Sequence, residues 1–326
     1  MYDVITLGSA TVDVFADTDS ELIRIETRTR KEELIAFPLG SKLLMKELVM
    51  TTGGGGTNAA CCMARLGCRT AFLGKIGVDV NGDNVCAQLE ADGVDFIGAR
   101  EGQTGFSVVL DSIHDDRTIL AFKGINDHLH AHDMPSTDSR WLYISSLMGE
   151  SFGTLLGWIA TTSSRIALNP SNYQVELGLS TLAPLLERVD VLVMNREEAC
   201  KLLGIDYHEG PPVAHLLSRL RSHSRWLAVI TDGADGVHVS DGRTYWRGLP
   251  AQHLSVRETT GAGDAFASTL TAMLIQGEPL RQAIHLAMTN AESVLAGRGA
   301  KQGLLTAPAL RERAAAVSRV IDEWVI

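Results

Sequence analysis

The chain has few cysteines, no long apolar run and no stretch of concentrated positive charge. None of its five cysteines forms a C-x-x-C pair, which argues against a zinc site and against a disulfide framework. Charged residues interrupt the apolar stretches, so no transmembrane helix is predicted. A net charge of −10 without a basic stripe argues against a nucleic-acid-binding protein. The sequence therefore predicts a cytoplasmic protein that binds neither membranes nor nucleic acids.

The composition is that of a globular protein. With 326 residues, 45% of them hydrophobic, the chain is long enough for one large α/β domain. The first residues, Met1–Ile5, run directly into apolar sequence without a basic segment or a cleavage-site pattern, so no signal peptide is expected. We therefore expect residues 1–326 to form a single domain.

Short apolar runs alternate with segments of helical pattern through most of the chain. The first run, Val4–Leu7, is closed by Gly8, which is typical of a buried strand. Strands that alternate with helices predict an α/β fold with a doubly wound, mostly parallel sheet covered on both faces. The other expected strands are Thr70–Leu73, Trp141–Ser145, Arg165–Leu168, Val189–Met194 and Trp226–Thr231, and the expected helices lie near Asn58–Leu66, Asp83–Ala91, Gly153–Thr161, Leu179–Leu186, Arg196–Leu203 and Val213–Leu220.

Two regions depart from this alternation. Residues from about 13 to 49 and from 105 to 122 contain short, alternating, charged segments, and the second region holds the turn His114–Asp116. Such segments predict small antiparallel strands outside the main sheet. We expect them to form one discontinuous β lid subdomain. The last third of the chain, Asp264–Trp324, is expected to be almost entirely helical.

The strongest functional signal is the segment Glu258–Phe266, in which a polar run leads through two glycines into an apolar helix. The glycines allow a close approach of backbone amides to a ligand, and the first amides of the helix lie at the positive end of its dipole. The amides of Gly261, Ala262 and Gly263 are thus suited to a transferring phosphoryl group. Asp264 would accept the proton of an attacking hydroxyl. A simple turn with a helix cap is the alternative that the spacing alone leaves open.

Two earlier segments carry polar groups next to expected strands and helices. The glycine run Gly53–Gly56 precedes an amphipathic helical segment, and Asn58 lies at the start of that helix. Asn58 could hydrogen-bond a hydroxyl there, although a flexible hinge is an equally good interpretation of the glycines. Asp13 follows the first strand, at the edge where open α/β sheets bind ligands. Taken alone, Asp13 is better interpreted as an exposed acid at a strand end.

Two later segments are explained by local structure alone. Asn195 and Glu198 follow an expected strand and form a good helix-capping pair. The segment Ile230–Val237 is typical of a β-hairpin with a tight turn. The turn positions of interest are Thr231, Gly233 and Gly236.

Three other motifs point toward competing functions but do not fit them. Gly77–Asp83 has an aspartate where a phosphate-binding P-loop requires lysine. The glycine run at Gly53 lacks the third glycine of a dinucleotide-binding motif. The three histidines of His128–His132 would share one side of an extended segment, but an exposed loop explains them better than a metal site.

Several of these segments resemble the motifs of the ribokinase-like (PfkB) carbohydrate kinase family, in the family's order from residue 3 to about 303. Residues 258–264 are similar to the signature D-T-x-G-A-G-D, and residues 53–58 are similar to G-G-x-G-x-N. Two positions depart from the pattern. Glu258 replaces the usual aspartate, which leaves a K⁺ requirement open, and Gly55 replaces a lysine that ribokinases carry. The resemblance implies a ribokinase-like α/β fold with a small β lid.

The resemblance also implies a role for each candidate residue. Asp264 would be the catalytic base, beside the phosphoryl-binding amides of Gly261, Ala262 and Gly263. The remaining roles fall into three groups. Asp13, Gly53, Gly54 and Asn58 would bind the substrate; Asn195 and Glu198 would organise Mg²⁺ and phosphates, Glu198 through water; and Thr231, Gly233, Gly236 and Asn290 would lie against the nucleotide.

We therefore expect an ATP- and Mg²⁺-dependent kinase that phosphorylates a hydroxyl group of a sugar or nucleoside, and the resemblance implies a homodimer. One alternative is a non-catalytic ligand-binding or regulatory protein on the same fold. A second alternative is a kinase of a sugar phosphate, for which Lys123 and Arg117 are candidate cations. The sequence does not predict the acceptor, because either Met148 or Glu150 could occupy the position that often carries a substrate-binding glutamate.

Overall fold

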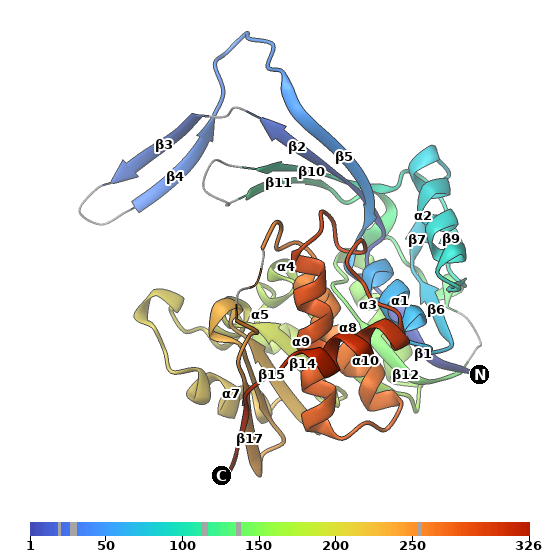
Figure 1. Ribbon diagram of the computed structural model, residues 1–326. Coiled ribbons are helices and arrows are strands. Elements are labelled where there is room, and N and C mark those ends of the chain that lie inside the picture. Colours follow the sequence, from blue (N-terminus) through green and yellow to red (C-terminus); the bar gives the residue numbers. More distant parts are fainter. Residues whose placement is uncertain (19–20, 27–30, 112–116, 135–137, 253, 255) are drawn as a thin grey trace.

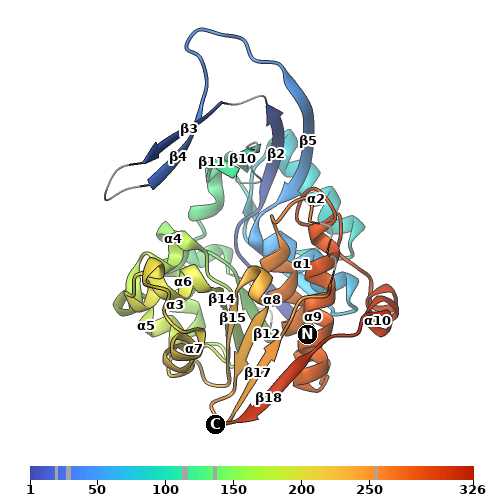
Figure 2. The same cartoon turned by 60° about the vertical axis from the view of Figure 1, so that its left-hand side comes forward.

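The computed structural model describes residues 1–326 except 19–20, 27–30, 112–116, 135–137, 253 and 255. Its main sheet has ten strands with helices on both faces (Figures 1 and 2). In spatial order, the first seven strands, from β8 through β1 to β15, run parallel to one another. The last three, β16, β17 and β18, form an antiparallel edge. In that order the ten strands are β8 (Asp95–Phe96), β6 (Thr70–Leu73), β1 (Tyr2–Leu7), β12 (Ser139–Ile144), β13 (Arg165–Leu168), β14 (Val191–Asn195), β15 (Leu227–Thr231), β16 (Val237–Ser240), β17 (Thr244–Gly248) and β18 (Ile321–Val325).

The central strands are buried on both faces, because successive side chains point into different cores. Along β1, Val4 faces one core and Ile5 faces the other. The predicted α/β fold with a mostly parallel sheet is thus confirmed. Helices α1 (Gly55–Arg65), α2 (Val80–Ala91), α8 (Ala262–Ile275), α9 (Leu280–Leu295) and α10 (Ala307–Ala316) contribute to the first core, and α3 (Gly149–Ile159), α5 (Gly178–Leu186), α6 (Arg196–Leu203) and α7 (Val213–Arg221) contribute to the second.

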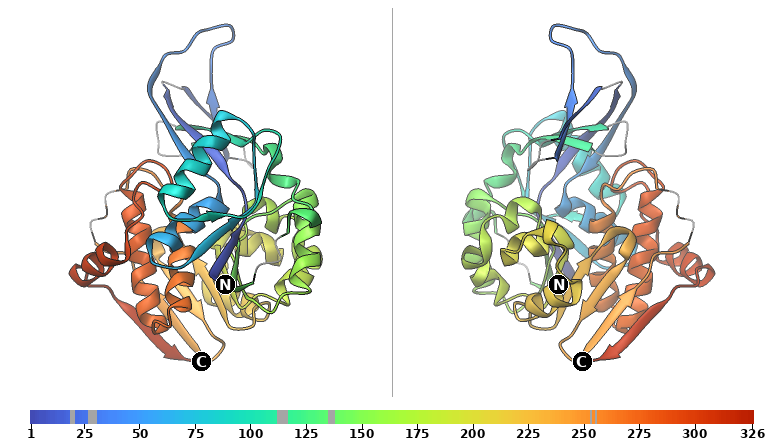
Figure 3. Two further views of the ribbon diagram at one scale, coloured as in Figure 1. Left: turned by 90° about the vertical axis from the view of Figure 1, so that its right-hand side faces the viewer. Right: turned by 90° about the vertical axis from the view of Figure 1, so that its left-hand side faces the viewer.

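A second sheet stands away from the main one, beyond the carboxyl end of β1 (Figures 1 and 3). We call its four strands the lid sheet. The expected strands are found, but β10 and β2 pair in parallel, because the two parts of the chain enter this sheet in the same direction. The predicted turn His114–Asp116 lies outside the described residues. In order the strands are β11 (Arg117–Phe122), β10 (Gly105–Asp111), β2 (Thr11–Thr18) and β5 (Met45–Gly53), and β3 (Glu21–Glu26) and β4 (Lys31–Ala36) form a separate hairpin.

The end of the chain differs from the prediction. The sequence predicts a helix up to Trp324, but α10 ends at Ala316 and residues 321–325 form β18. Strand β18 pairs with β17, so the pairing of two distant segments overrides the local helical pattern. The ring of Trp324 packs against that of Tyr245, with centroids 5.3 Å apart. In the part of the chain that is described, no helix is long and apolar enough to cross a membrane.

Candidate active site

Two glycines join lid strand β5 to helix α1, where the backbone passes close to the segment that follows β1. A Cβ on Gly53 would lie 1.8 Å from Asp13 Oδ2, and a Cβ on Gly54 would lie 2.4 Å from the carbonyl oxygen of Ser9. Gly54 also has a φ of 93°, which favours glycine. The structure therefore brings Asp13, Gly53 and Gly54 together, as the sequence predicts, and the glycines make room for the carboxylate.

Helices α1 and α8 lie side by side (Figure 2), and their first turns bring Asn58 and Asp264 into contact. Asn58 Nδ2 donates a hydrogen bond to Asp264 Oδ2 at 2.8 Å. The amide oxygen of Asn58 is buried and has no hydrogen-bond partner among the described residues. An unpaired buried acceptor costs free energy, so a ligand hydroxyl is a suitable partner for it. These two residues form the centre of the candidate site.

Gly55 keeps the space beside this pair open. A Cβ on Gly55 would lie 2.0 Å from Ser145 Oγ and 3.6 Å from Asp264 Oδ1. Ser145 follows β12, the strand next to β1. The lysine that ribokinases carry at this position would therefore displace Ser145, and its absence here is explained by the packing.

Buried charges dominate the electrostatics of this region. Burial raises the pKa of Asp264, and the hydrogen bond from Asn58 and the charge of Lys301 oppose that change. Burial also raises the pKa of Asp13, which neighbouring hydroxyl groups and Lys301 lower. Burial lowers the pKa of Lys301, and the charges of Asp13 and Asp264 are among those that raise it. The ammonium group therefore favours the ionised form of both carboxylates.

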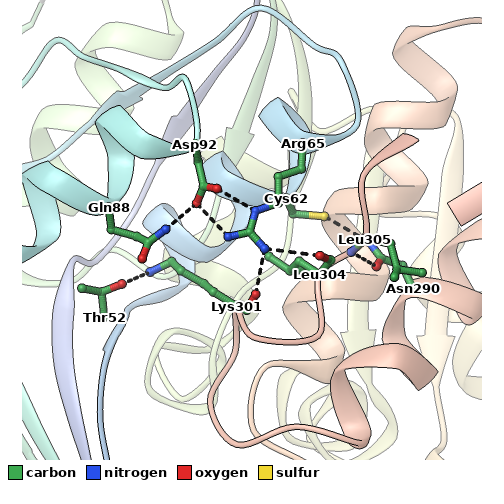
Figure 4. Close-up of polar contacts among 9 residues, drawn as sticks. All are labelled: Thr52, Cys62, Arg65, Gln88, Asp92, Asn290, Lys301, Leu304 and Leu305. Carbon is green, nitrogen blue, oxygen red and sulfur yellow. Dashed lines mark hydrogen bonds and ion pairs between the residues drawn. The ribbon is translucent and has the colours of Figure 1, made fainter. Parts of the chain in front are cut away.

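Lys301 is a residue of the candidate site that the sequence analysis missed. Its Nζ donates to Thr52 Oγ1 at 3.1 Å and to Thr57 Oγ1 at 2.9 Å (Figure 4 shows the first contact). Thr52 lies on β5 and Thr57 on α1, so the lysine joins the lid sheet to the helix next to the two glycines. A single lysine in the loop 299–303 belongs to no motif, and only the fold brings it to the carboxylates.

The loop that carries Lys301 is held by Arg65 of α1. The guanidinium donates to both carboxylate oxygens of Asp92, at 2.7 and 3.1 Å, and to the carbonyl of Lys301 at 2.9 Å (Figure 4). A two-pronged contact of this kind fixes the direction of the arginine as well as its position. The lysine therefore projects from a fixed piece of backbone.

Asn290 does not take the position predicted for it. Its side chain is fully buried, with Nδ2 donating to Thr269 Oγ1 at 2.8 Å and Oδ1 accepting from the Leu305 amide at 3.0 Å (Figure 4 shows the second contact). These bonds join α8, α9 and the segment after α9, and the side chain has no exposed surface for a ligand. Asn290 therefore has a structural role in place of the predicted contact with the nucleotide.

The segment that precedes α8 is shaped by one carboxylate and one glycine. Glu258 Oε1 accepts hydrogen bonds from the amides of Thr259 and Thr260, at 2.8 and 2.9 Å. The helix begins after Gly261, whose φ is 82°, and a Cβ there would lie 2.2 Å from the Cβ of Ala300. Glycine is thus required at position 261 by both conformation and space.

The start of α8 presents the predicted amides in part. The amide of Ala262 donates to the Thr259 carbonyl at 3.3 Å, a long bond that leaves it only partly available. Gly263 has open space where a Cβ would be, and the first amides of a helix have no partner within that helix. An anion at this position would lie beside Asp264, which belongs to the same first turn.

A cavity of about 640 Å³ opens beside the start of α8. It is of the size of small-molecule sites, and Glu292 is its one charged residue among those described. The predicted positions Thr231, Gly233 and Gly236 line it, together with Ala262 and Gly263. Its other lining residues are Ala234, Val237, Pro250, Ala251, Gln252, Leu254, Val256, Thr259, Phe266, Met288, Ala291, Glu292 and Leu295.

Asn195 and Glu198 cap helix α6 reciprocally. Asn195 Oδ1 accepts from the Glu198 amide at 2.8 Å, and Glu198 Oε2 accepts from the Asn195 amide at 2.9 Å. Burial raises the pKa of Glu198 to about 7, against the hydrogen bond from Asn195, and the charge of Asp264 adds to the rise. A cation beside this carboxylate would favour its charged form, and Mg²⁺ prefers oxygen ligands and retains waters.

The described residues contain no group of three or more histidine, cysteine, aspartate or glutamate side chains placed to hold a metal, and His128–His132 is no exception. A metal ion in the candidate site would therefore need ligands from water and phosphate as well as from Glu198.

Comparisons with known proteins identify the family of the chain. The model of the pfkB family of carbohydrate kinases matches residues 3–307. The ribokinase of Haemophilus influenzae is 25% identical over 277 residues, which cover 82% of this chain and 88% of that protein, and the cytidine kinase of Thermococcus kodakarensis is 25% identical, covering 81% and 92%.

Solved structures show the same fold. The ribokinase of Thermotoga maritima superposes with a TM-score of 0.78 at 19% identity, over 97% of this chain and all of that one. The adenosine kinase of Sinorhizobium meliloti superposes with a TM-score of 0.78 at 23% identity, over 95% and 99%. With a family match over nearly its whole length, this chain belongs to the pfkB family of carbohydrate kinases.

Proposed function

We propose that this kinase transfers the γ-phosphoryl group of ATP to a hydroxyl group of a sugar or a nucleoside, with Asp264 as the catalytic base. The observation that carries the proposal is the hydrogen bond of 2.8 Å between Asn58 and Asp264, made by the first turns of two helices far apart in the sequence. Beside this pair lie Asp13 and the space that Gly53–Gly55 keep free of side chains. Phosphoryl transfer needs this combination of a base, a bound hydroxyl and an anion site.

The acceptor would bind between Asp13 and Asn58. The carboxylate of Asp13 accepts hydrogen bonds from acceptor hydroxyls, and the unpaired amide oxygen of Asn58 accepts another. Asp264 takes the proton of the attacking hydroxyl, and Asn58 keeps the carboxylate pointed toward it. The reaction requires Asp264 to be ionised, which the charge of Lys301 favours against the effect of burial.

ATP would occupy the cavity of about 640 Å³, with its base between the hairpin and α9 and its phosphates toward the start of α8. The amides of Gly261 and Gly263 hold the transferring group, and that of Ala262 contributes less because it already donates to the Thr259 carbonyl. Asn195 and Glu198 would hold Mg²⁺ through water. When bound, Mg²⁺ supplies positive charge to the phosphates.

The lid sheet supports two further parts of the proposal. It stands over the acceptor side through Asp13 and Gly53, so its closure would exclude water from the reaction. One face of the sheet is apolar: Val14, Met50, Val108 and Leu120 are paired across four strands, and Met50 and Leu120 are more than half exposed, whereas Val14 is buried. An apolar sheet face of this kind is suited to a second copy of the chain, in agreement with the expected homodimer.

Among the described residues, neither Lys123 nor Lys301 favours a sugar phosphate over a sugar or nucleoside as the acceptor. Of the two candidate cations, Lys123 lies over the ring of Tyr173 at 4.4 Å, and the side chain of Arg117 is outside the described residues. Lys301 contacts the hydroxyls of Thr52 and Thr57, and its charge is balanced by the carboxylates of Asp13 and Asp264.

The test is ADP formation from MgATP with a panel of sugars, polyols, sugar phosphates and nucleosides, with each product identified by mass spectrometry. We expect turnover that depends on one sugar or nucleoside and a product heavier by one phosphoryl group. Nucleotide binding without turnover on any acceptor would instead favour the non-catalytic alternative. Turnover restricted to a sugar phosphate would favour the other alternative.

A further inference from the structure

The last part of the chain lies outside the family match but contacts the wall of the nucleotide cavity. The match ends at residue 307, and the residues beyond it form most of α10, strand β18 and the connection between them, which carries Arg319. Through β18 this segment extends the main sheet next to β17. The side chain of Arg319 is fully buried, which is unusual for an arginine without a specific partner.

The partner of Arg319 is a carboxylate of the cavity. Arg319 Nη1 and Nη2 donate to the two carboxylate oxygens of Glu292, each at 2.7 Å, and Glu292 lines the cavity from α9. Nη1 also donates to the carbonyl of Leu249 at 2.8 Å. The guanidinium therefore joins α9 to the loop that follows β17.

Glu292 also binds the loop that follows β17. Its Oε1 accepts a hydrogen bond from the amide of Ala251 at 2.9 Å. Pro250, Ala251 and Gln252 line the cavity, and the amide of Leu249 donates to the carbonyl of Val320 at 3.1 Å. The position of this wall is thus set by one carboxylate, and the direction of that carboxylate is set by Arg319.

The ion pair between Arg319 and Glu292 also neutralises the charge of the cavity wall. An unpaired carboxylate in a mostly apolar cavity would repel the phosphates of a nucleotide, and it would be costly to bury. The pair with Arg319 removes the net charge and keeps both oxygens occupied. The nucleotide then meets a neutral, fixed wall.

We propose that Arg319 is a positioning residue of the nucleotide site, which holds Glu292 and the segment 249–252 in the form that binds the nucleotide. This inference rests on the proposed function, because it assigns the cavity to the nucleotide. The residue touches neither the acceptor nor the reacting atoms. Its removal should therefore weaken nucleotide binding and leave the acceptor side unchanged.

The test compares Arg319→Met with Arg311→Met by titration calorimetry with MgATP and with ADP, which needs no acceptor. Arg311 lies on α10 of the same segment, is more than half exposed and pairs with Glu278, so its variant is the matched control. We expect the Kd of Arg319→Met to rise at least about tenfold and that of Arg311→Met to stay unchanged. Once an acceptor is known, the KM for ATP should rise while kcat and the KM for the acceptor do not.

The double variant Glu292→Gln/Arg319→Met separates the effect of the unpaired charge from a general loss of packing. The side chain that Glu292→Gln introduces carries no charge and can still accept from the Ala251 amide, so the double variant should bind more tightly than Arg319→Met alone. Equal Kd values for Arg319→Met and the wild type would overturn the inference, as would a double variant weaker than the single one. If Arg319→Met does not fold, Arg319→Lys, which keeps the charge but loses the two-pronged contact with Glu292, should still raise the Kd, and an unchanged Kd would overturn the inference. A wild-type protein that binds no nucleotide would contradict the proposed function itself.

Discussion

The two sides of the candidate active site are built in opposite ways. The proposed acceptor side holds two carboxylates and an ammonium group, those of Asp13, Asp264 and Lys301, next to three close-packed glycines. The proposed nucleotide side is a cavity of about 640 Å³ in which Glu292 is the one charged residue described, and Arg319 neutralises it. Because the charged groups of the proposed chemistry and the lining of the proposed nucleotide cavity are separate, we expect variants to affect one side at a time.

Among variants that leave the proposed base in place, the largest separation is expected from Gly53→Ala. The new methyl group would lie 1.8 Å from Asp13 Oδ2 and must displace that carboxylate. We expect kcat/KM for the acceptor to fall about a hundredfold, because misplacement by an ångström is enough for such a loss. The Kd for MgATP should not change, and calorimetry beside steady-state kinetics measures both.

The control for this variant is Gly153→Ala. Gly153 lies in α3 with nothing within 4 Å of the added methyl group, so the change should leave activity intact and slightly stabilise the helix. An unaffected acceptor kcat/KM in Gly53→Ala would show that Asp13 is not an acceptor ligand.

A smaller effect is expected from Lys301→Met, which removes the cation of the acceptor side. The charged and titratable groups that act on Lys301 are Asp13, Asp264, Asp92 and Cys61. Without the ammonium, the pKa of Asp264 rises further, so the acidic limb of the pH profile of kcat should move to higher pH. At neutral pH we expect kcat to fall roughly tenfold.

Lys42→Met, which removes an exposed lysine near the lid sheet, is the control and should leave the profile in place. If Lys301→Met loses activity but keeps the acidic limb of the wild type, the lysine acts through the junction of β5 and α1 and not through charge.

The smallest effect is expected from Glu198→Gln, which changes the pH dependence of stability. It tests whether Glu198, proposed to lie near the phosphates, has a raised pKa. The pKa of Glu198 in the folded protein is raised to about 7, so the folded state binds this proton more tightly than the unfolded state. The stability that the proton contributes is present below the ordinary pKa of glutamate and is lost as the pH rises through 7.

Thermal unfolding between pH 5 and pH 8 measures this loss. The wild type should lose on the order of 1–3 kcal/mol more than Glu198→Gln over that range. Parallel curves for the two proteins would contradict the raised pKa.

The sequence predicts the parts of the site that are local and fails where distant segments meet. Asp264, Asn58 and the glycines are found because each belongs to a short motif at the start of a helix. Lys301 and Arg319 could not be found, because each is a single residue whose partners are 27 or more positions away, as with Arg319 and Glu292.

Two errors have the same cause. Asn290 follows the family's pattern, but packing against Thr269 and Leu305 removes it from the cavity. Residues 321–325 have a helical pattern, but they pair with β17 and form a strand. The alternation of strands and helices from β12 to β15 was predicted correctly because the hydrophobic pattern of the main sheet is set within each segment.

The central claim is that Asp264 is the base on a separable acceptor side, and Asp264→Asn tests it most directly. The change is nearly isosteric and keeps a partner for Asn58. With the acceptor identified by the panel, kcat should fall roughly a thousandfold while the Kd for MgATP stays within about twofold of the wild type. A variant that retains most of its kcat would contradict the account, because the phosphoryl transfer would then not depend on this carboxylate.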